Sequence, residues 1–373
     1  MFGKTYSGKK VLVTGHTGFK GSWLTEWLLL LGAEVTGLAL EASTEPALFR
    51  QLNLASKMDH NVVDVCDGIA VRELMKRSRP DFVFHLAAQP LVRLSYSIPV
   101  ETFATNVMGT VHVLEGLRDL QLAGKACAAV MVTTDKCYEN KEWTNGYRED
   151  DPMGGYDPYS ASKGAAEIAI HGMRRSYFSS PTSLVRVASA RGGNVIGGGD
   201  WAADRIVPDC IRALRHGAPI SVRNKTATRP WQHVLEPLSG YLLLGAALES
   251  MHSRTTPFSA SISSGGAAGA AFNFGPNLSS NRTVADLVQE LLKHWPGQWE
   301  DQSDPQAPHE ASKLNLSTDK AFHLLDWQPR WNFSTTLAKT VDWYREAESC
   351  DDAEAFTTLT LRQIHEYQED RPG

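Results

Sequence analysis

The chain has 373 residues, of which 21% are charged, and its formal net charge at pH 7 is −5. A chain of this length can bury a large core and predicts two lobes. Because the sequence has no basic stripe and no polybasic cluster, we expect neither a nucleic-acid-binding nor a membrane-bound protein.

The first predicted elements are a strand over residues 10–14 and a helix that reaches about residue 31, joined by a glycine-rich turn. Gly15, Gly18 and Gly21 are spaced three apart in this turn. Glycines at a strand-to-helix turn let the backbone approach a pyrophosphate, which lies at the N-terminus of the helix. We therefore predict a dinucleotide site here, although a tight turn that needs glycine only for packing would show the same spacing.

The second predicted strand covers residues 34–40, and an acidic residue that binds the ribose of NAD is expected near its end. Glu41 comes one position late for that role and is equally interpreted as a solvated loop carboxylate. The residues alone therefore leave NAD and NADP open. A short strand over residues 61–65 follows, and its Asp64 either holds the adenine amino group or starts the next turn.

A strand over residues 81–89 runs into the small residues Ala87 and Ala88, which would let the backbone lie against the cofactor. We interpret His85 as a packed strand histidine rather than as a catalyst. A helix over residues 106–121 follows. The alternation of strands and helices predicts a parallel, doubly wound α/β sheet of Rossmann type.

The central stretch of the chain begins with an apolar strand over residues 128–133, which ends at Thr134, Asp135 and Lys136. Open α/β sheets bind their ligands at the carboxyl ends of such strands. A predicted helix over residues 159–174 carries Tyr159 and Lys163, which are four apart and share one helical face. A lysine ammonium beside a phenol lowers the phenol pKa and makes it a general base. The spacing alone also fits a surface tyrosine and a solvated lysine.

A further strand over residues 182–190 leads into a glycine-rich segment over residues 191–201. We interpret this segment as a flexible, ligand-facing loop or as a linker between lobes. Arg205, Arg223 and Arg229 follow, near Trp201 and Trp231. Arginine binds phosphate through two parallel hydrogen bonds, and tryptophan can stack on a base or sugar, so this group predicts a nucleotide-type ligand. Any one of these arginines could instead form a surface ion pair.

The remaining chain predicts a smaller, mostly helical lobe. Helices are expected from residue 233 to about 249, over 283–295 and over 337–348, with a mobile Ser/Gly/Ala-rich surface loop over 252–271. We expect an NAD-binding Rossmann domain over residues 1–190, with 233–255 packing back on it. The C-terminal substrate-binding lobe is expected from residues 191–232 and 256–350, and residues 351–373 form a peripheral, partly helical tail.

The five cysteines are an odd number without a C-x-x-C pair, so we expect neither a disulfide framework nor a metal site. Cys137 is interpreted as a packed thiol. The first ten residues are polar and show no signal peptide, and the longest apolar stretch is too short to cross a bilayer. We therefore expect a cytoplasmic protein.

Five long motifs carry a family resemblance. They are TGHTGFKGSW (residues 14–23), AQPLVR (88–93), TDKCYEN (134–140), GNVIGGGDW (193–201) and TRPWQH (228–233). Over nearly its whole length the chain resembles the extended short-chain dehydrogenase/reductase family, and within it the nucleotide-sugar 4,6-dehydratases that act on CDP-glucose. The resemblance implies bound NAD, CDP-glucose as substrate in deoxysugar (O-antigen precursor) biosynthesis, and a homodimer built through a helix bundle, or a tetramer built from it.

The resemblance also implies roles for individual residues. The catalytic residues would be Thr134, Asp135, Lys136, Tyr159 and Lys163. The cofactor contacts would be Gly15, Thr17, Gly18, Phe19, Lys20, Gly21, Asp64, Val65, Leu86, Ala87, Ala88, Asn106, Thr133, Tyr159 and Lys163. The substrate contacts would be Gln89, Arg93, Asn194, Trp201, Arg205, Ile206, Arg223, Arg229, His233 and Glu310. Two departures are Thr133-Thr134, where such enzymes often carry Thr-Ser, and a long loop over 252–271.

The implied reaction begins when Tyr159, assisted by Lys163 and Thr134, removes the proton of the sugar 4-hydroxyl and hydride leaves C4. Lys136 then takes the acidified C5 proton, Asp135 protonates the departing 6-hydroxyl, and hydride returns to C6. Another nucleotide-sugar dehydratase, an epimerase or a reductase on the same fold stays open, since fold does not fix chemistry. A non-catalytic NAD-binding regulator would be expected to lack Tyr159 or Lys163, and both are present.

Overall fold

The centre of the molecule is a parallel sheet of seven strands in the order β11-β6-β5-β4-β1-β2-β3. The structure is a computed structural model that describes residues 2–251, 270–303 and 313–370. The strands are β1 (Lys10–Thr14), β2 (Glu34–Ala39), β3 (Asp59–Val62), β4 (Phe82–His85), β5 (Cys127–Thr133), β6 (Val185–Arg191) and β11 (Ala271–Asn273). This order confirms the predicted Rossmann-type fold and places the topological switch point between β1 and β4, where such folds bind dinucleotides.

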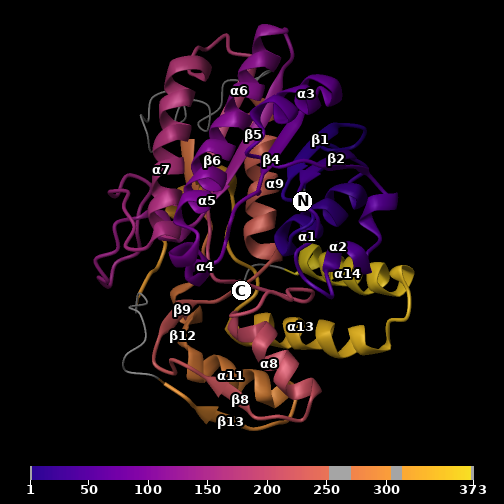
Figure 1. Cartoon of the computed structure of the whole chain (residues 1–373), viewed down its shortest axis with the longest axis vertical. Helices are drawn as coiled ribbons and strands as arrows, with labels where there is room; N and C mark the ends of the chain where they lie inside the picture. The colour runs from indigo at the N-terminus through magenta and orange to yellow at the C-terminus, as the bar shows by residue number, and fades with distance from the viewer. Residues whose placement is uncertain (1, 252–269, 304–312, 371–373) are drawn as a thin grey trace.

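Helices cover both faces of the sheet, each over its own apolar core (Figure 1). Along β1, Val11 and Val13 point into one core and Leu12 into the other. Burial on both faces explains why the central strands read as continuous apolar runs. The helices of this domain are α1 (Phe19–Leu30), α2 (Leu48–Gln51), α3 (Gly68–Ser78), α4 (Val92–Ser97), α5 (Pro99–Phe103), α6 (Gly109–Leu122), α7 (Pro158–Met173) and α9 (Leu235–Ser250).

A smaller lobe lies below the sheet domain in Figure 1. Among the described residues it contains short paired strands and helices that bury their apolar faces against one another. Its strands are β7 (Val195–Ile196), β8 (Ile220–Val222), β9 (Thr228–Pro230), β10 (Gln232–His233), β12 (Asn281–Thr283) and β13 (Trp299–Asp301). The remaining helices are α8 (Ile206–Arg215), α11 (Val284–His294), α12 (Asp319–Leu325) and α13 (Phe333–Glu346).

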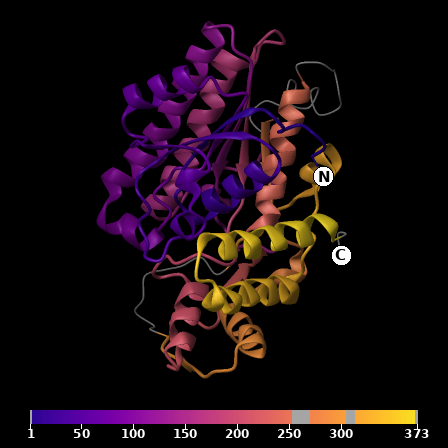
Figure 2. The ribbon, with the colours of Figure 1, turned by 90° about the vertical axis from the view of Figure 1, so that its right-hand side faces the viewer.

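The end of the chain packs onto its beginning. The tail that we expected to be peripheral is mostly the helix α14 (Ala353–Glu369), which runs beside α13 in Figure 2 and contacts α1. The ring of Tyr367 lies 5.9 Å from that of Trp27, and the Tyr367 hydroxyl donates to the buried carboxylate of Glu236 at 2.7 Å. The tail therefore closes the core on the α1 face of the sheet.

Three elements differ from the sequence-based expectation. β3 begins and ends earlier than the predicted strand over residues 61–65, so Asp64 lies in the turn after it. The residues just before α6 form a π-helical turn over Ala104–Met108 rather than the start of a regular helix. β11 comes from the part of the chain assigned to the substrate lobe, yet it pairs with β6 at the edge of the central sheet. Most of the loop over 252–271 lies outside the described residues.

Within residues 2–251, 270–303 and 313–370, no helix is long and apolar enough to span a membrane. The same residues contain no group of three or more His, Cys, Asp or Glu side chains that could hold a metal ion. All five cysteines are free thiols, and Cys137 is buried as predicted.

Candidate active site

The glycine turn is shaped by close backbone contacts at the switch point of the sheet. Gly15 has φ +74°, and a Cβ there would lie 2.8 Å from the backbone nitrogen of Ala87. A Cβ at Gly21 would lie 2.1 Å from the carbonyl oxygen of Gly15. Gly18 begins α1, and no side chain caps the first amides of that helix. The turn thus offers free helix N–H groups and an open backbone, which is the arrangement that binds a pyrophosphate.

Thr14, at the end of β1, holds the neighbouring strand in place and was not singled out from the sequence. Its hydroxyl oxygen accepts the backbone N–H groups of Leu86 and Ala87, each at 3.1 Å. It also lies 2.7 Å from Nδ1 of His85, whose Nε2 lies 3.0 Å from the Thr110 hydroxyl. Burial lowers the pKa of His85 to about 3. His85 is therefore a packed strand histidine, as predicted.

Three other expected cofactor contacts, Thr17, Asp64 and Val65, lie in the turns that follow β1 and β3. The Thr17 hydroxyl donates a hydrogen bond of 2.8 Å to the carbonyl oxygen of Leu40, the residue that follows β2. Asp64 is exposed and accepts the N–H of Cys66 at 2.9 Å, which supports its alternative interpretation as a turn residue. Val65 beside it is buried.

Asn106 joins two parts of the site from the π-helical turn. Its side chain accepts the N–H of Gln89 at 2.9 Å and donates to the Ser162 hydroxyl at 2.8 Å. Because Asn106 is fully buried, it holds the loop after β4 against α7. Its expected contact with the cofactor stays a prediction.

Several of the residues that we expected to be catalytic lie together where β5 ends, and we call this group the cluster. The Thr134 hydroxyl donates to Oδ1 of Asp135 at 2.8 Å, and Asn194 donates to Oδ2 at 3.1 Å. The hydroxyls of Thr134 and Tyr159 share a hydrogen bond. A Cβ at Gly193 would lie 2.1 Å from Oδ1 of Asp135, so the carboxylate fits only against a glycine. The structure thus brings together Thr134, Asp135, Tyr159 and Asn194.

The pKa of Tyr159 is shifted in the direction opposite to the one that we expected. Burial raises the pKa of Tyr159 to about 12, and the hydrogen bond with Thr134 opposes the shift. This direction is opposite to the lowering that we expected from Lys163, because burial disfavours the charged phenolate. The pKa of Lys163 is itself lowered to about 8, by burial and by the ammonium of Lys20, while Glu167 opposes the shift.

Two lysines lie at the edge of this cluster. Lys20, half-buried in the first turn of α1, places its ammonium 5.9 Å from the ring centre of Tyr241. Burial and Arg205 lower the pKa of Lys20 to about 8. Lys20 therefore lies within electrostatic range of Asp135. Lys136 is half-buried on the 3₁₀ turn Asp135–Cys137, directly after the acid.

Two of the expected substrate arginines, Arg93 and Arg223, meet at the carboxylate of Asp204, and we call this pair the arginine rim. Arg205 pairs with Asp200 at 2.8 Å. Asp204 pairs with Arg223 at 2.7 Å and lies 3.8 Å from Arg93. Arg93 comes from α4 of the sheet domain and Arg223 from the small lobe, so this rim spans both lobes.

The chain is similar in sequence to known nucleotide-sugar 4,6-dehydratases. The family model for GDP-mannose 4,6 dehydratase matches residues 12–340. The chain belongs to this family. CDP-glucose 4,6-dehydratase of Salmonella typhimurium is 45% identical over 346 residues, which cover 91% of each chain. A dTDP-glucose 4,6-dehydratase of Shigella flexneri is 24% identical, covering 90% of this chain and 92% of its own.

Solved structures share the fold of this GDP-mannose 4,6-dehydratase family member. A dTDP-glucose 4,6-dehydratase from Streptomyces venezuelae, determined with NAD, gives a TM-score of 0.73 at 24% identity and covers 91% of this chain and 98% of its own. A UDP-glucose 4-epimerase from Thermotoga maritima gives 0.74 at 20% identity, covering 91% and 99%. Dehydratases and epimerases therefore share this backbone, and the side chains must decide the chemistry.

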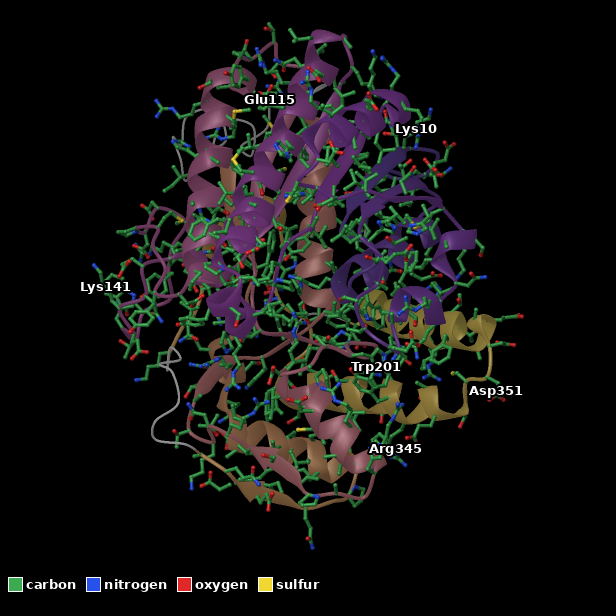
Figure 3. The ribbon with its side chains drawn as sticks, in the orientation of Figure 1. Lys10, Glu115, Lys141, Trp201, Arg345 and Asp351 are labelled. Atoms are coloured by element: carbon green, nitrogen blue, oxygen red, sulfur yellow. The ribbon has the colours of Figure 1, made fainter. Side chains whose placement is uncertain are left out.

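Other expected substrate residues in this family member lie deeper. Trp201 is buried where the sheet domain meets the small lobe (Figure 3), with its ring 5.1 Å from that of Tyr344. His233 is fully buried between the rings of Trp23 and Trp331, and burial lowers its pKa to about 3. Its ring is packed against protein side chains, and its expected contact with the substrate stays a prediction.

The remaining substrate candidates are spread more widely. Ile206 is half-buried at the first position of α8, and Arg229 is half-buried on β9. Glu310 lies outside the described residues.

The glycine-rich segment is not a loose loop. A Cβ at Gly198 would lie 2.1 Å from the ring of Trp343, and one at Gly199 would lie 2.8 Å from Leu48. The indole of Trp23 donates to the Gly198 carbonyl at 2.9 Å. These glycines allow close packing, which corrects the interpretation of a flexible segment.

A buried charge pair behind the cluster was missed from the sequence. Glu167 on α7 accepts hydrogen bonds from Thr133 at 2.5 Å, from Ser189 at 2.9 Å and from Arg191 at 2.8 Å. Arg191 also donates to the Tyr138 hydroxyl at 2.7 Å. The pair ties the ends of β5 and β6 to the helix of Tyr159. The available signal was the spacing of Glu167, four residues after Lys163 on one helical face.

Proposed function

We propose that the chain converts CDP-glucose into CDP-4-keto-6-deoxyglucose, a 4,6-dehydration that supplies deoxysugars. The observation that carries the proposal is the acid–base pair at the end of β5, where buried Asp135 is held by Thr134 and Asn194 and is followed by Lys136. Elimination of water across C5 and C6 needs both an acid and a base, whereas C4 epimerisation needs neither at these carbons. The 45% identity with the Salmonella enzyme supports CDP-glucose as the substrate.

The residues of the glycine turn fit NAD as the resident cofactor. The close contacts of Gly15 and Gly21 and the uncapped start of α1 leave the backbone open to a pyrophosphate, with Ala87 on the opposite strand. When bound, NAD accepts hydride from C4 of the sugar and returns it to C6. Because oxidation and reduction cancel within one turnover, the cofactor stays bound and is used catalytically.

Tyr159 is the proposed base for the 4-hydroxyl. Its phenol must lose a proton in a buried site where burial raises its pKa to about 12. A nearby cation lowers the pKa of a phenol, and Lys163, one helical turn away on α7, is placed to supply that cation. Thr134 is hydrogen-bonded to the phenol and can orient it.

Asp135 and Lys136 serve the elimination. Oxidation at C4 makes the C5 proton acidic, and Lys136 takes that proton. Asp135 gives a proton to the 6-hydroxyl, which leaves as water while the C5–C6 double bond forms. When hydride returns to C6, Lys136 gives its proton back to C5, so that the double bond is reduced. The hydrogen bonds from Thr134 and Asn194 fix the carboxyl group for this transfer.

The expected substrate arginines are the proposed contacts of the diphosphate, and the arginine rim of Arg93 and Arg223 is the part that joins the two lobes. Arg93, Arg205, Arg223 and Arg229 can each offer a planar fork of N–H donors to phosphate oxygens. Arg93 and Arg223 come from different lobes, so a diphosphate bound there would bridge them. Asn194, which donates to Asp135, is the proposed contact for the sugar end of such a ligand.

We also propose that the chain forms a dimer through α5, the π-helical turn and α7, and that it works in the cytoplasm. Val100 on α5 is 75% exposed and Ile168 on α7 is 63% exposed, and Phe103 at the end of α5 and Met108 on the π-helical turn are exposed as well. Exposed apolar side chains that gather on neighbouring helices mark a protein–protein contact. A helix bundle between two copies would cover them.

The decisive experiment supplies the protein with catalytic NAD and a panel of CDP-, dTDP-, UDP- and GDP-linked hexoses. We expect a 4-keto-6-deoxy product from CDP-glucose without net NADH. Stoichiometric NADH would indicate a simple dehydrogenase, and a galactose-configured product would indicate an epimerase. A faster reaction with dTDP-glucose would contradict the base preference and leave the dehydratase mechanism standing.

A further inference from the structure

A carboxylate lies between two of the arginines that we assign to the diphosphate. Oδ1 of Asp204 is 2.7 Å from Nη1 of Arg223 and 3.8 Å from Nη1 of Arg93. Arg223 is also held by Asp209 of α8 at 3.1 Å. Arg93 belongs to the sheet domain and Arg223 to the small lobe. A single carboxylate therefore joins the two lobes at the rim where a diphosphate would bind.

The backbone presents Asp204 at this position. Its φ is +61°, in the left-handed region that Asp and Asn tolerate better than most other residues. Just before it, the carbonyl oxygens of Trp201 and Ala202 accept hydrogen bonds from Arg212 of α8 at 3.1 and 3.3 Å, which hold this loop. A ligand would therefore displace the Asp204 side chain, which is 50% exposed, more readily than the loop that carries it.

The electrostatics favour an exchange of one anion for another. Arg223, and after it Arg93, hold the pKa of Asp204 below its ordinary value. Asp204 is therefore ionised at neutral pH and faces the same guanidinium groups that phosphate oxygens prefer. A diphosphate and this carboxylate repel each other, so both cannot occupy the two arginines together.

We propose that Asp204 is a built-in competitor of the substrate, whose carboxylate occupies Arg93 and Arg223 until a nucleoside diphosphate displaces it. The inference rests on the proposed function, because it takes the arginine rim as the diphosphate site. The product carries the same diphosphate as the substrate. A competitor that returns to the arginines lowers the affinity for both and speeds product release.

The test replaces Asp204 with Asn and measures the binding of CDP to the full chain by titration calorimetry. Asn suits the left-handed backbone and matches Asp in size, so the variant keeps the local fold. Removing one or two half-exposed ion pairs should tighten CDP binding by about 3- to 10-fold. The gain should shrink as salt is raised, because salt screens exposed charges.

Two further variants isolate the effect. Asp301→Asn removes an equal charge from the small lobe, where Asp301 pairs with Lys225 at 2.7 Å, and should leave CDP affinity within about twofold of wild type. Arg223→Ala should weaken CDP binding about 10- to 100-fold. Adding Asp204→Asn to Arg223→Ala should then give a smaller gain than in the wild type, because the main contested arginine is gone.

Weaker or unchanged CDP binding by the Asp204→Asn protein overturns the proposal, since the carboxylate would then orient the arginines or have no part in binding. An equal gain from Asp301→Asn also overturns it, because the effect would be one of overall charge. If Arg223→Ala binds CDP as tightly as the wild type, Arg223 is not part of the diphosphate site and the proposal is wrong. The turnover of CDP-glucose by the wild type, measured separately, decides the proposed function.

Discussion

Replacing Gly193 with Ala tests the position of the acid without removing it. A Cβ at this residue would lie 2.1 Å from Oδ1 and 2.4 Å from Oδ2 of Asp135, whereas carbon–oxygen contacts below 3.0 Å are essentially never seen. The carboxylate must therefore retreat by about 1 Å, and a misplacement of that size can lower a rate by about 100-fold. Gly193 does not have a positive φ, so alanine adds no backbone strain.

The displacement should act on elimination more than on oxidation. We expect kcat for dehydration to fall by about 100-fold in Gly193→Ala, while NAD binding stays at the wild-type level. On mixing with CDP-glucose, bound NADH should accumulate, because Tyr159 and Lys163 are untouched. Stopped-flow absorbance of NADH and the rate of 4-keto product formation measure the two steps separately.

A control lies on the helix of Tyr159. Gly172→Ala adds a methyl group that meets nothing within 4 Å and should leave kcat unchanged. A wild-type rate of dehydration in Gly193→Ala would show that Asp135 does not need the position seen here. Loss of NAD binding in that variant would place the steric effect at the cofactor and refute our account of this segment.

Three further predictions concern single side chains. Lys136→Ala should slow turnover by about 100- to 10,000-fold and stop the exchange of solvent deuterium into C5. The variant should still form bound NADH. Deuterium exchange at the wild-type rate would exclude Lys136 as the base. Glu167→Gln should lower the free energy of unfolding, measured with urea, by about 3–5 kcal/mol, because it leaves the buried Arg191 without its carboxylate. Adding Arg191→Met to this variant should recover part of the loss. No recovery would contradict this cause. Burial raises the pKa of Glu236 to about 7 from the ordinary 4.5, so its contribution to stability is full below pH 4.5 and is lost as pH rises through 7. Glu236→Gln should therefore flatten the plot of unfolding free energy against pH in this range. Parallel plots for the variant and the wild type would refute the assignment.

Much of the sheet domain could be predicted because its signals are local. The strand that ends at Thr134 is a run of buried apolar residues, and the helix of Tyr159 begins at a proline after Asp157, whose side chain caps it. Residue spacing alone then places Tyr159 and Lys163 on one face. The position of Asp135 at the strand end followed from the general rule for parallel sheets.

What could not be predicted depends on residues far apart in sequence. Asp204 meets Arg93 across more than one hundred residues, and neither residue carries a signal for the other. The raised pKa of Tyr159 reflects how deeply it is buried, which no local pattern shows. His233 lies in a motif shared with proposed substrate residues, yet its ring is packed between two tryptophans.

The contact of α14 with α1 has a consequence for how the chain is made. Trp27 and Glu236 obtain their partner Tyr367 only when the last helix has left the ribosome. At about 5–20 residues per second, Glu236 waits roughly 7–26 s for that hydroxyl. During this interval the nascent chain exposes apolar surface on the α1 side of the sheet. Loss of α14 by truncation should therefore yield a protein that aggregates during synthesis, even though the proposed catalytic residues all lie upstream.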